Sequence, residues 1–177
     1  MAKSAEQPVA IELLMADHRK VEQLFEEFEG EKEDTEAKSG VAERICNALK
    51  VHAQVEEELF YPWVADQLDD EDDQEMVQEA RIEHQTAKDL IAKIEDCDPE
   101  DEQYDALVKV LSEYIKHHVR EEEQEMFPKV ASMTDELDEL GQEIAARKAE
   151  LMEEMGIEEE GATPPARERG SEERHAR

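Results

Sequence analysis

The chain has 177 residues, of which 51 are acidic and 20 are basic, so its formal net charge is −31. A charge of this size repels nucleic acid and anionic membranes, and we expect neither as a partner. The sequence has no run of about 18 apolar residues and no secretory signal, and Cys46 and Cys97 lie outside any metal-binding spacing, so we expect a cytoplasmic protein.

Apolar residues at helical spacing predict four long helices that follow an N-terminal extension of residues 1–8. The predicted helices span approximately residues 9–29, 37–65, 73–95 and 100–133. Acidic or proline-containing stretches separate them, including residues 66–73 and 96–101. Pro62 and Pro128 lie inside the second and fourth helices, and each predicts a kink or a helix end because proline lacks a backbone N–H.

A weaker helical pattern follows in residues 134–155 and predicts an additional helix whose apolar side can pack along the bundle. Residues 156–177 are polar, contain prolines and show no periodicity, so we expect a disordered tail. One domain of ordinary size, residues 9–133, therefore carries the main core.

One arrangement of histidine and glutamate occurs twice in this chain, with an offset of 66 residues. His18, His52 and Glu56 recur at this offset as His84, His118 and Glu122. Several apolar positions and the two prolines Pro62 and Pro128 match at the same offset. We therefore predict two copies of one helix–turn–helix unit.

The spacing of these polar residues places them on the apolar faces of their helices. Along the second helix, Ile45, Leu49, His52, Glu56 and Leu59 follow one another at steps of 3 or 4 residues. The same relation holds for His18, His84, His118 and Glu122. An ionised carboxylate buried without a partner is costly, and the stripes contain no basic residue. Imidazole and carboxylate are transition-metal ligands, so we predict a symmetric site for two metal ions.

A single inward histidine is more often a hydrogen-bonded core residue than a ligand, and the prediction depends on all four being in register. His117 is rotated by about 100° from His118 around the helix, so we expect it to lie at the surface or behind the ligands. We expect packing roles for Cys46 and for the aromatic residues near the ligands, which are Phe60, Tyr61, Trp63 and Phe127. We expect no role for His175, which lies in the tail.

Three stretches, ADHRKVEQLF, HAQVEEELFYP and HVREEEQEMFP, resemble typical segments of the hemerythrin-like family, the HHE cation-binding domain. The resemblance covers residues 9–133 and implies an all-α, up-down-up-down four-helix bundle around two iron ions with an oxo or hydroxo bridge. It also implies that Glu56 and Glu122 bridge the irons, with the remaining ligands divided as His18 and His52, and His84 and His118. Zinc or manganese could occupy the same ligands.

The chain departs from the oxygen-carrying hemerythrins, which have His-x-x-x-His on the third helix and His-x-x-x-x-Asp on the fourth. Here Lys88 follows His84 by four residues, and Glu122 follows His118 by four. The loss of one histidine leaves both irons open, which disfavours simple oxygen carriage. The resemblance instead implies a diiron protein that binds or reacts with O2, NO or peroxide in oxidative or nitrosative stress.

Such a protein could be an oxidoreductase with an electron donor as a partner. Three alternatives remain open from the sequence. The first is an iron- or oxygen-sensing or iron-binding module without turnover. The second is a role in iron–sulfur cluster repair, and the third is a plain helical bundle without metal.

Overall fold

A computed structural model describes residues 7–31 and 34–158, and the predicted tail from residue 159 on lies outside these ranges. The described residues form α-helices, two π-helical turns and connecting loops. The elements are α1 (Val9–Gly30), α2 (Thr35–Val55), η1 (Glu56–Phe60), α3 (Tyr61–Gln67), α4 (Glu71–Asp96), α5 (Glu102–Glu121), η2 (Glu122–Met126), α6 (Phe127–Val130) and α7 (Thr134–Glu154). No helix in this part of the chain is long and apolar enough to cross a bilayer.

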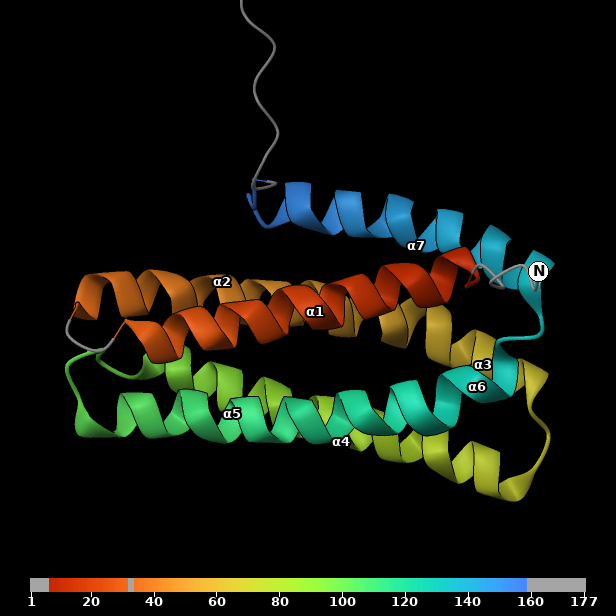
Figure 1. The fold of residues 1–177 in the computed structure, drawn as a ribbon, viewed down its shortest axis with the longest axis horizontal. Coiled ribbons are helices and arrows are strands. Elements are labelled where there is room, and N and C mark those ends of the chain that lie inside the picture. Colours follow the sequence, from red (N-terminus) through yellow and green to blue (C-terminus); the bar gives the residue numbers. More distant parts are fainter. Residues whose placement is uncertain (1–6, 32–33, 159–177) are drawn as a thin grey trace, which may run out of the picture.

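Two antiparallel helical hairpins form the bundle (Figure 1). The first consists of α1 and the continuous run α2–η1–α3, and the second of α4 and the run α5–η2–α6. Aspartates begin three of the helices: the Asp34 carboxylate accepts from Ala37 N at 3.0 Å, and Asp70 and Asp101 cap α4 and α5 in the same way. The predicted all-α four-helix bundle with an added C-terminal helix is confirmed.

The expected irregularity at each proline takes the form of one wide π-helical turn. In η1 the N–H of Tyr61 donates to the carbonyl of Glu56, five residues earlier, and Pro62 follows in the first turn of α3. In η2 the N–H of Phe127 donates to the carbonyl of Glu122, and Pro128 follows in the same way. Each glutamate of the predicted site therefore begins a π turn, in which its backbone carbonyl accepts from the residue five positions later.

The core consists of two apolar clusters, one toward each end of the bundle. One cluster contains Phe28, Ile45 and Leu111, among others, near the loops that close the two hairpins. The other contains Phe60 and Val130 and includes residues of α7. The predicted histidine and glutamate ligands are buried between these two clusters, in the middle of the bundle.

The helix α7 lies along α1 and α2, on the outside of the first hairpin (Figure 1). It runs parallel to α1, since Gly141 lies against Val9 and Lys148 forms an ion pair with Asp17. The Val9 N–H at the start of α1 donates to the Asp138 carboxylate of α7 at 2.8 Å. A backbone N–H at the start of α1, which has no partner within its own helix, thus finds an acceptor on α7.

We predict that Gly141→Ala disturbs the contact between α7 and α1. A Cβ atom at this position would lie 2.6 Å from Val9 Cγ1 and 2.7 Å from the backbone N of Ala10, which cannot rotate away. Overpacking of this kind costs about 1–3 kcal/mol of unfolding free energy, measurable by urea denaturation.

Gly40→Ala is the matched control, because a Cβ at Gly40 of α2 meets nothing within 4 Å. Alanine is the better helix former by roughly 0.5–1 kcal/mol, so this variant should be slightly more stable than the wild type. Equal effects of the two substitutions would contradict the close approach of α7 to α1.

Candidate metal centre

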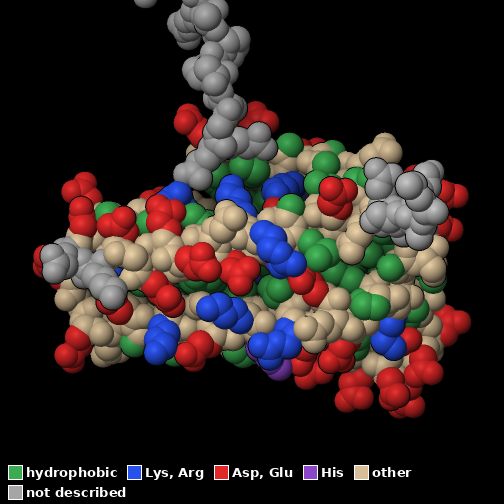
Figure 2. All heavy atoms as spheres, in the orientation of Figure 1, with side chains coloured by type: hydrophobic (Ala, Val, Ile, Leu, Met, Phe, Trp, Pro, Cys, Tyr) green, Lys and Arg blue, Asp and Glu red, His purple; other side chains and the backbone are tan. Residues whose placement is uncertain are grey.

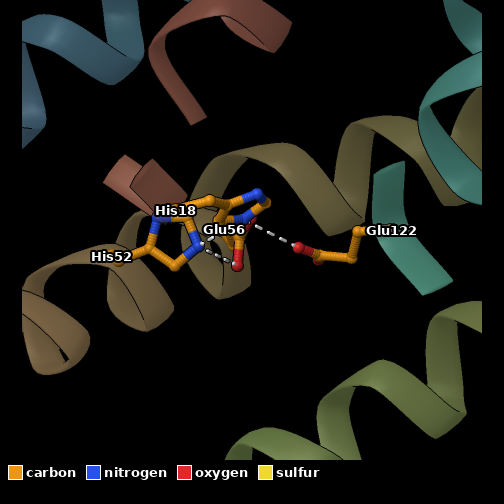
Figure 3. A group of neighbouring side chains, drawn as sticks. All are labelled: His18, His52, Glu56 and Glu122. Carbon is orange, nitrogen blue, oxygen red and sulfur yellow. Dashed lines mark hydrogen bonds and ion pairs between the residues drawn. The ribbon is translucent and has the colours of Figure 1, made fainter. Parts of the chain in front are cut away.

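The six predicted ligands converge from four helices and two π turns onto the middle of the bundle. His18 comes from α1, His52 and Glu56 from the α2–η1 run, His84 from α4, and His118 and Glu122 from the α5–η2 run. All six are at most 6 % exposed. In Figure 3, His18, His52, Glu56 and Glu122 point toward one another between the helices.

These residues form two groups that share both glutamates. One group is His18, His52, Glu56 and Glu122, and the other is Glu56, His84, His118 and Glu122. Within each group the potential ligand atoms lie within 4.8 Å of one another. The structure therefore brings together the pairs that the sequence predicted, with one glutamate from each hairpin between them.

The first group has two imidazole Nε2 atoms, those of His18 and His52, 3.2 Å apart. His18 Nε2 lies 3.2 Å from Glu122 Oε2, and His52 Nε2 lies 3.3 Å from Glu56 Oε2. Two ligands at the ~2.1 Å typical of metal–imidazole bonds lie about 3 Å apart when they meet at roughly a right angle. The spacing fits a shared metal ion.

The second group repeats this geometry. The Nε2 atoms of His84 and His118 are 3.1 Å apart, His84 Nε2 is 3.2 Å from Glu56 Oε2, and His118 Nε2 is 3.5 Å from Glu122 Oε1. The two oxygens of Glu122 thus face different groups, Oε2 toward His18 and Oε1 toward His118. This is the orientation that a carboxylate needs to bridge two ions.

Each of the four histidines also has a carboxylate at its other ring nitrogen. The Nδ1 contacts are His18 with Glu123 at 2.9 Å, His52 with Asp17 at 3.4 Å, His84 with Glu57 at 3.0 Å, and His118 with Glu83 at 2.6 Å. A carboxylate only accepts, so Nδ1 donates in each pair. The lone pair of the neutral ring is then on Nε2, which faces the centre.

Basic residues hold three of these outer carboxylates in place. Arg19 donates to both oxygens of Glu123, at 3.0 and 3.1 Å, and Lys88 donates to both oxygens of Glu57, each at 2.7 Å. Lys148 of α7 pairs with Asp17. Lys88, which replaces the histidine of the oxygen carriers, therefore supports His84 through Glu57.

These four carboxylates are not among the residues predicted from the sequence, although the sequence contains a signal for them. Asp17 and Glu83 are related by the 66-residue offset, as are Glu57 and Glu123. Each stands directly beside a predicted ligand. Because acidic residues are abundant throughout the chain, a match at the 66-residue offset does not by itself distinguish these four residues from surface carboxylates.

Tyr61 does more than the packing predicted for it. Its hydroxyl donates to Glu122 Oε1 at 2.6 Å and lies 3.1 Å from His84 Nε2 and 3.4 Å from Glu56 Oε2. The residue at the 66-residue offset is Phe127, which stacks on the His18 ring with centroids 5.9 Å apart. The second metal group therefore has a phenol hydroxyl beside it where the first has a bare aromatic ring.

The charges of the site are strongly coupled. Burial opposes protonation of His18, but its contacts with Glu122 and Glu123 raise its pKa to about 10. Burial likewise opposes the charged form of His118, whereas the charge of Glu122 and the hydrogen bond to Glu83 raise its pKa to about 9. Despite its complete burial, the nearby histidines hold the pKa of Glu122 well below its usual value. Without metal, protons supply the positive charge that balances these carboxylates.

An unpaired buried oxygen of Glu56 indicates that the residues of this site suit a metal ion. Glu56 is 0 % exposed, and its Oε1 atom has no hydrogen-bond partner in the part of the chain that the structure describes. A buried carboxylate oxygen without a partner is costly, and a cation beside it removes that cost. Two imidazoles and two carboxylates for each position form a donor set that suits iron, zinc or manganese.

A narrow cavity of about 20 Å³ adjoins the centre. It is lined by His18, His52 and His84 and otherwise mainly by aliphatic side chains, including Leu49 and Ile115. This volume holds about one water-sized molecule. A diatomic molecule is of a size that fits this space beside the histidines.

The other residues singled out in the sequence have structural positions of their own. Cys46 is buried in the apolar cluster as predicted, and burial raises the pKa of its thiol to about 12. The His117 side chain is 53 % exposed and contacts Glu83 and Glu121 instead of the centre. His175 lies outside the described residues.

Comparisons with known proteins agree with this geometry. Residues 9–130 match the family described as the hemerythrin HHE cation-binding domain. A crystal structure of a hemerythrin HHE cation-binding domain-containing protein from Mycobacterium kansasii aligns with a TM-score of 0.69 and 20 % identity, covering 81 % of this chain and 86 % of that one. At this identity the likeness shows the fold alone.

A curated relative is a DNA nickase from Nostoc sp., which is 26 % identical over 153 residues. The alignment covers 85 % of this chain but 42 % of the relative. The chain thus spans less than half the length of that protein.

We predict that the metal-free protein loses stability as the pH rises. The pKa values of His18 and His118 in the folded state, about 10 and 9, lie above the ordinary histidine value of 6.5. Their protonation therefore stabilises the fold fully below about pH 6.5, and this stabilisation is lost as the pH rises through 9 and 10. Urea unfolding at pH 6.5 and 10 should show a loss of at least about 2 kcal/mol.

The variant His18→Gln separates the deprotonation of His18 from the general effect of alkaline pH on the surface charges, because glutamine cannot take up a proton. This variant should lose clearly less stability over the same pH interval than the wild type. An identical pH dependence of the two proteins would show that His18 is neutral in the metal-free fold.

We predict that Tyr61→Phe destabilises the metal-free protein through the loss of one hydrogen bond. The phenol donates to the buried Glu122 carboxylate, and burial together with the charges of Glu122 and Glu56 raises the pKa of Tyr61 well above its usual value, so it stays a donor. Hydrogen bonds to charged groups contribute about 1.5–3 kcal/mol. Tyr104→Phe, in the apolar cluster near the hairpin loops, is the control and should cost less than about 1 kcal/mol.

Proposed function

The chain belongs to the hemerythrin HHE cation-binding domain family, and on this basis we propose that it holds two iron ions at the centre described above. His18 and His52 would bind one ion, His84 and His118 the other, and Glu56 and Glu122 would bridge them. The observation that carries the proposal is the pair of buried groups that share both glutamates. Zinc or manganese is compatible with the same ligands.

We propose further that the centre binds or reacts with a small molecule such as O2, NO or peroxide, for which iron supplies the redox chemistry. The small cavity beside His18, His52 and His84 supports a ligand of this size. Its walls are mainly aliphatic, which favours an uncharged molecule there. An oxidoreductase function in stress response also requires an external electron donor as a partner.

The protein's own residues would act on this chemistry through position and charge. Arg19 and Lys88 fix the carboxylates that orient His18 and His84. The Tyr61 hydroxyl keeps its proton, because burial and the neighbouring carboxylates raise its pKa, and it therefore presents a hydrogen-bond donor close to the second pair of histidines. Phe127 offers no such proton beside His18.

The similarity to a DNA nickase does not extend this proposal to nucleic acid. Nicking is a property of that longer protein, of which this chain matches 42 %. A net charge of −31 opposes contact with phosphate backbones. We therefore propose that nucleic acid is not a partner. We propose separately that the protein acts within the cytoplasm.

The metal proposal is tested by elemental analysis of protein produced with excess iron. We expect two metal ions per chain in the wild type and at most one in His52→Ala, because that variant lacks one imidazole of the first group. The metal-loaded wild type should also melt at a higher temperature than the metal-free protein, since binding to the folded state adds stability.

His117→Ala is the control for this experiment, because His117 lies outside both groups and should leave the final metal content at two. Less than about one metal ion per wild-type chain under saturating iron would contradict the proposal and favour a plain bundle.

Reactivity then separates an oxidoreductase from a sensing or binding module. The reduced, iron-loaded protein is mixed with O2, NO or peroxide while its visible spectrum is recorded. Rapid multiple turnover with a supplied reductant is the outcome expected for an oxidoreductase. A slow, stoichiometric spectral change would favour the non-catalytic module.

A further inference from the structure

The two hairpins present different outer faces beside the centre, although their inner faces match. In the first hairpin, α7 covers this outer face with apolar contacts. At the 66-residue offset, the covered apolar residues correspond to polar residues of α4, α5 and η2. The pairs are Leu13 with Glu79, Val51 with His117, Val55 with Glu121, and Leu59 with Glu125.

The polar face of the second hairpin contains a cavity of about 270 Å³ between α4 and the α5–η2 run. Its acidic lining residues are Asp72, Glu75, Glu79, Glu83, Glu121, Glu122 and Glu125. Within residues 7–31 and 34–158, no lysine or arginine lines it. Figure 2 shows acidic side chains gathered at the end of the molecule where α4 begins. Several of these carboxylates have no cationic partner in the described part of the chain, which leaves a negative potential at the mouth.

The cavity extends from the surface to the metal centre. Its inner wall includes His118 and Glu122, both ligands of the proposed centre. Glu122 is 1 % exposed, and its Oε2 receives no hydrogen bond of good geometry, although His18 Nε2 lies 3.2 Å away. A cation that moves inward along this cavity therefore reaches a buried carboxylate that can bind it.

Three potential ligands lie outside the centre beside this path: Glu83 and Glu121 line the cavity, and His117 contacts both of them. Glu83, His117 and Glu121 have one ligand atom each within 4.8 Å of the others. His117 Nε2 is 3.0 Å from Glu121 Oε1 and 3.5 Å from Glu83 Oε1. The other oxygen of Glu83, Oε2, contacts His118. One carboxylate therefore borders both this group and the centre.

In the first hairpin, the carboxylate that corresponds to Glu83 is paired with a lysine. Its counterpart at the 66-residue offset, Asp17, contacts His52 and is neutralised by Lys148 of α7. Among the described residues, no lysine or arginine forms an ion pair with Glu83, which faces an imidazole and a second carboxylate instead. The second hairpin thus offers ligands where the first supplies a fixed positive charge.

We propose that Glu83, His117 and Glu121 form a transit site for a divalent cation, and that the acidic cavity is the route by which iron reaches the centre. This proposal rests on the metal function proposed above and adds an uptake path to it. Three ligands at a partly exposed position bind a cation weakly enough to release it. The His117 and Glu121 side chains are 53 % and 34 % exposed, whereas Glu83 is 9 % exposed, so the group spans the step from solvent to interior.

The test measures the rate of iron uptake by the full-length, metal-free protein. Anaerobic Fe²⁺ is mixed with the protein, and a chromogenic chelator that captures only unbound Fe²⁺ is added after varied delays. The variant is His117→Ala/Glu121→Gln, which leaves Glu83 and its contact with His118 intact. Glu113→Gln is the matched control, because Glu113 is an exposed residue of the same helix that does not line the cavity.

We expect the double variant to take up iron about tenfold more slowly at low ionic strength, with the same final iron content as the wild type. The control should load within about twofold of the wild-type rate, and salt should slow the wild type more than the double variant. Unchanged uptake by the double variant would overturn the transit site, as would an unchanged rate with a reduced final content. Failure of the wild type to take up iron would instead contradict the metal centre itself.

Discussion

The burial of two carboxylates in the middle of an apolar bundle is the constraint on which the rest of this structure depends. Glu56 and Glu122 lie between two apolar clusters and are almost completely shielded from water. An isolated charge in this position is not tolerable, so positive charge must be supplied locally. His18 and His118 can supply it as protonated rings, or the four imidazoles can hold cations in place of the protons.

The surroundings of the histidines follow from the same requirement. Each ring must present Nε2 inward, and a carboxylate at Nδ1 ensures this. These outer carboxylates are themselves partly buried, and Arg19, Lys88 and Lys148 neutralise three of them. Although basic residues are scarce in this chain, these three pair with carboxylates that in turn contact the histidines of the centre.

The 66-residue repeat corresponds to a centre with nearly twofold geometry. A few residues break this symmetry at positions that affect chemistry and access. Tyr61 and Phe127 occupy equivalent positions at the two π turns, yet only Tyr61 brings a hydroxyl to the carboxylates. The helix α7 closes the outer face of one hairpin and leaves the other open and acidic. The inner surfaces of the hairpins thus bind alike, while their outer surfaces differ.

The sequence by itself determined the four-helix bundle and the convergence of the six proposed ligands, because helical spacing and a 66-residue repeat are local, periodic properties. Only the tertiary structure decided which carboxylates support the histidines, since Asp17 and Glu123 reach their partners across helices that are distant in the chain. The same applies to the Tyr61 hydroxyl, whose direction depends on a π turn that the apolar pattern does not encode. The position of α7 was also undetermined, because an amphipathic helix fits either hairpin until Gly141 and Asp138 meet the start of α1.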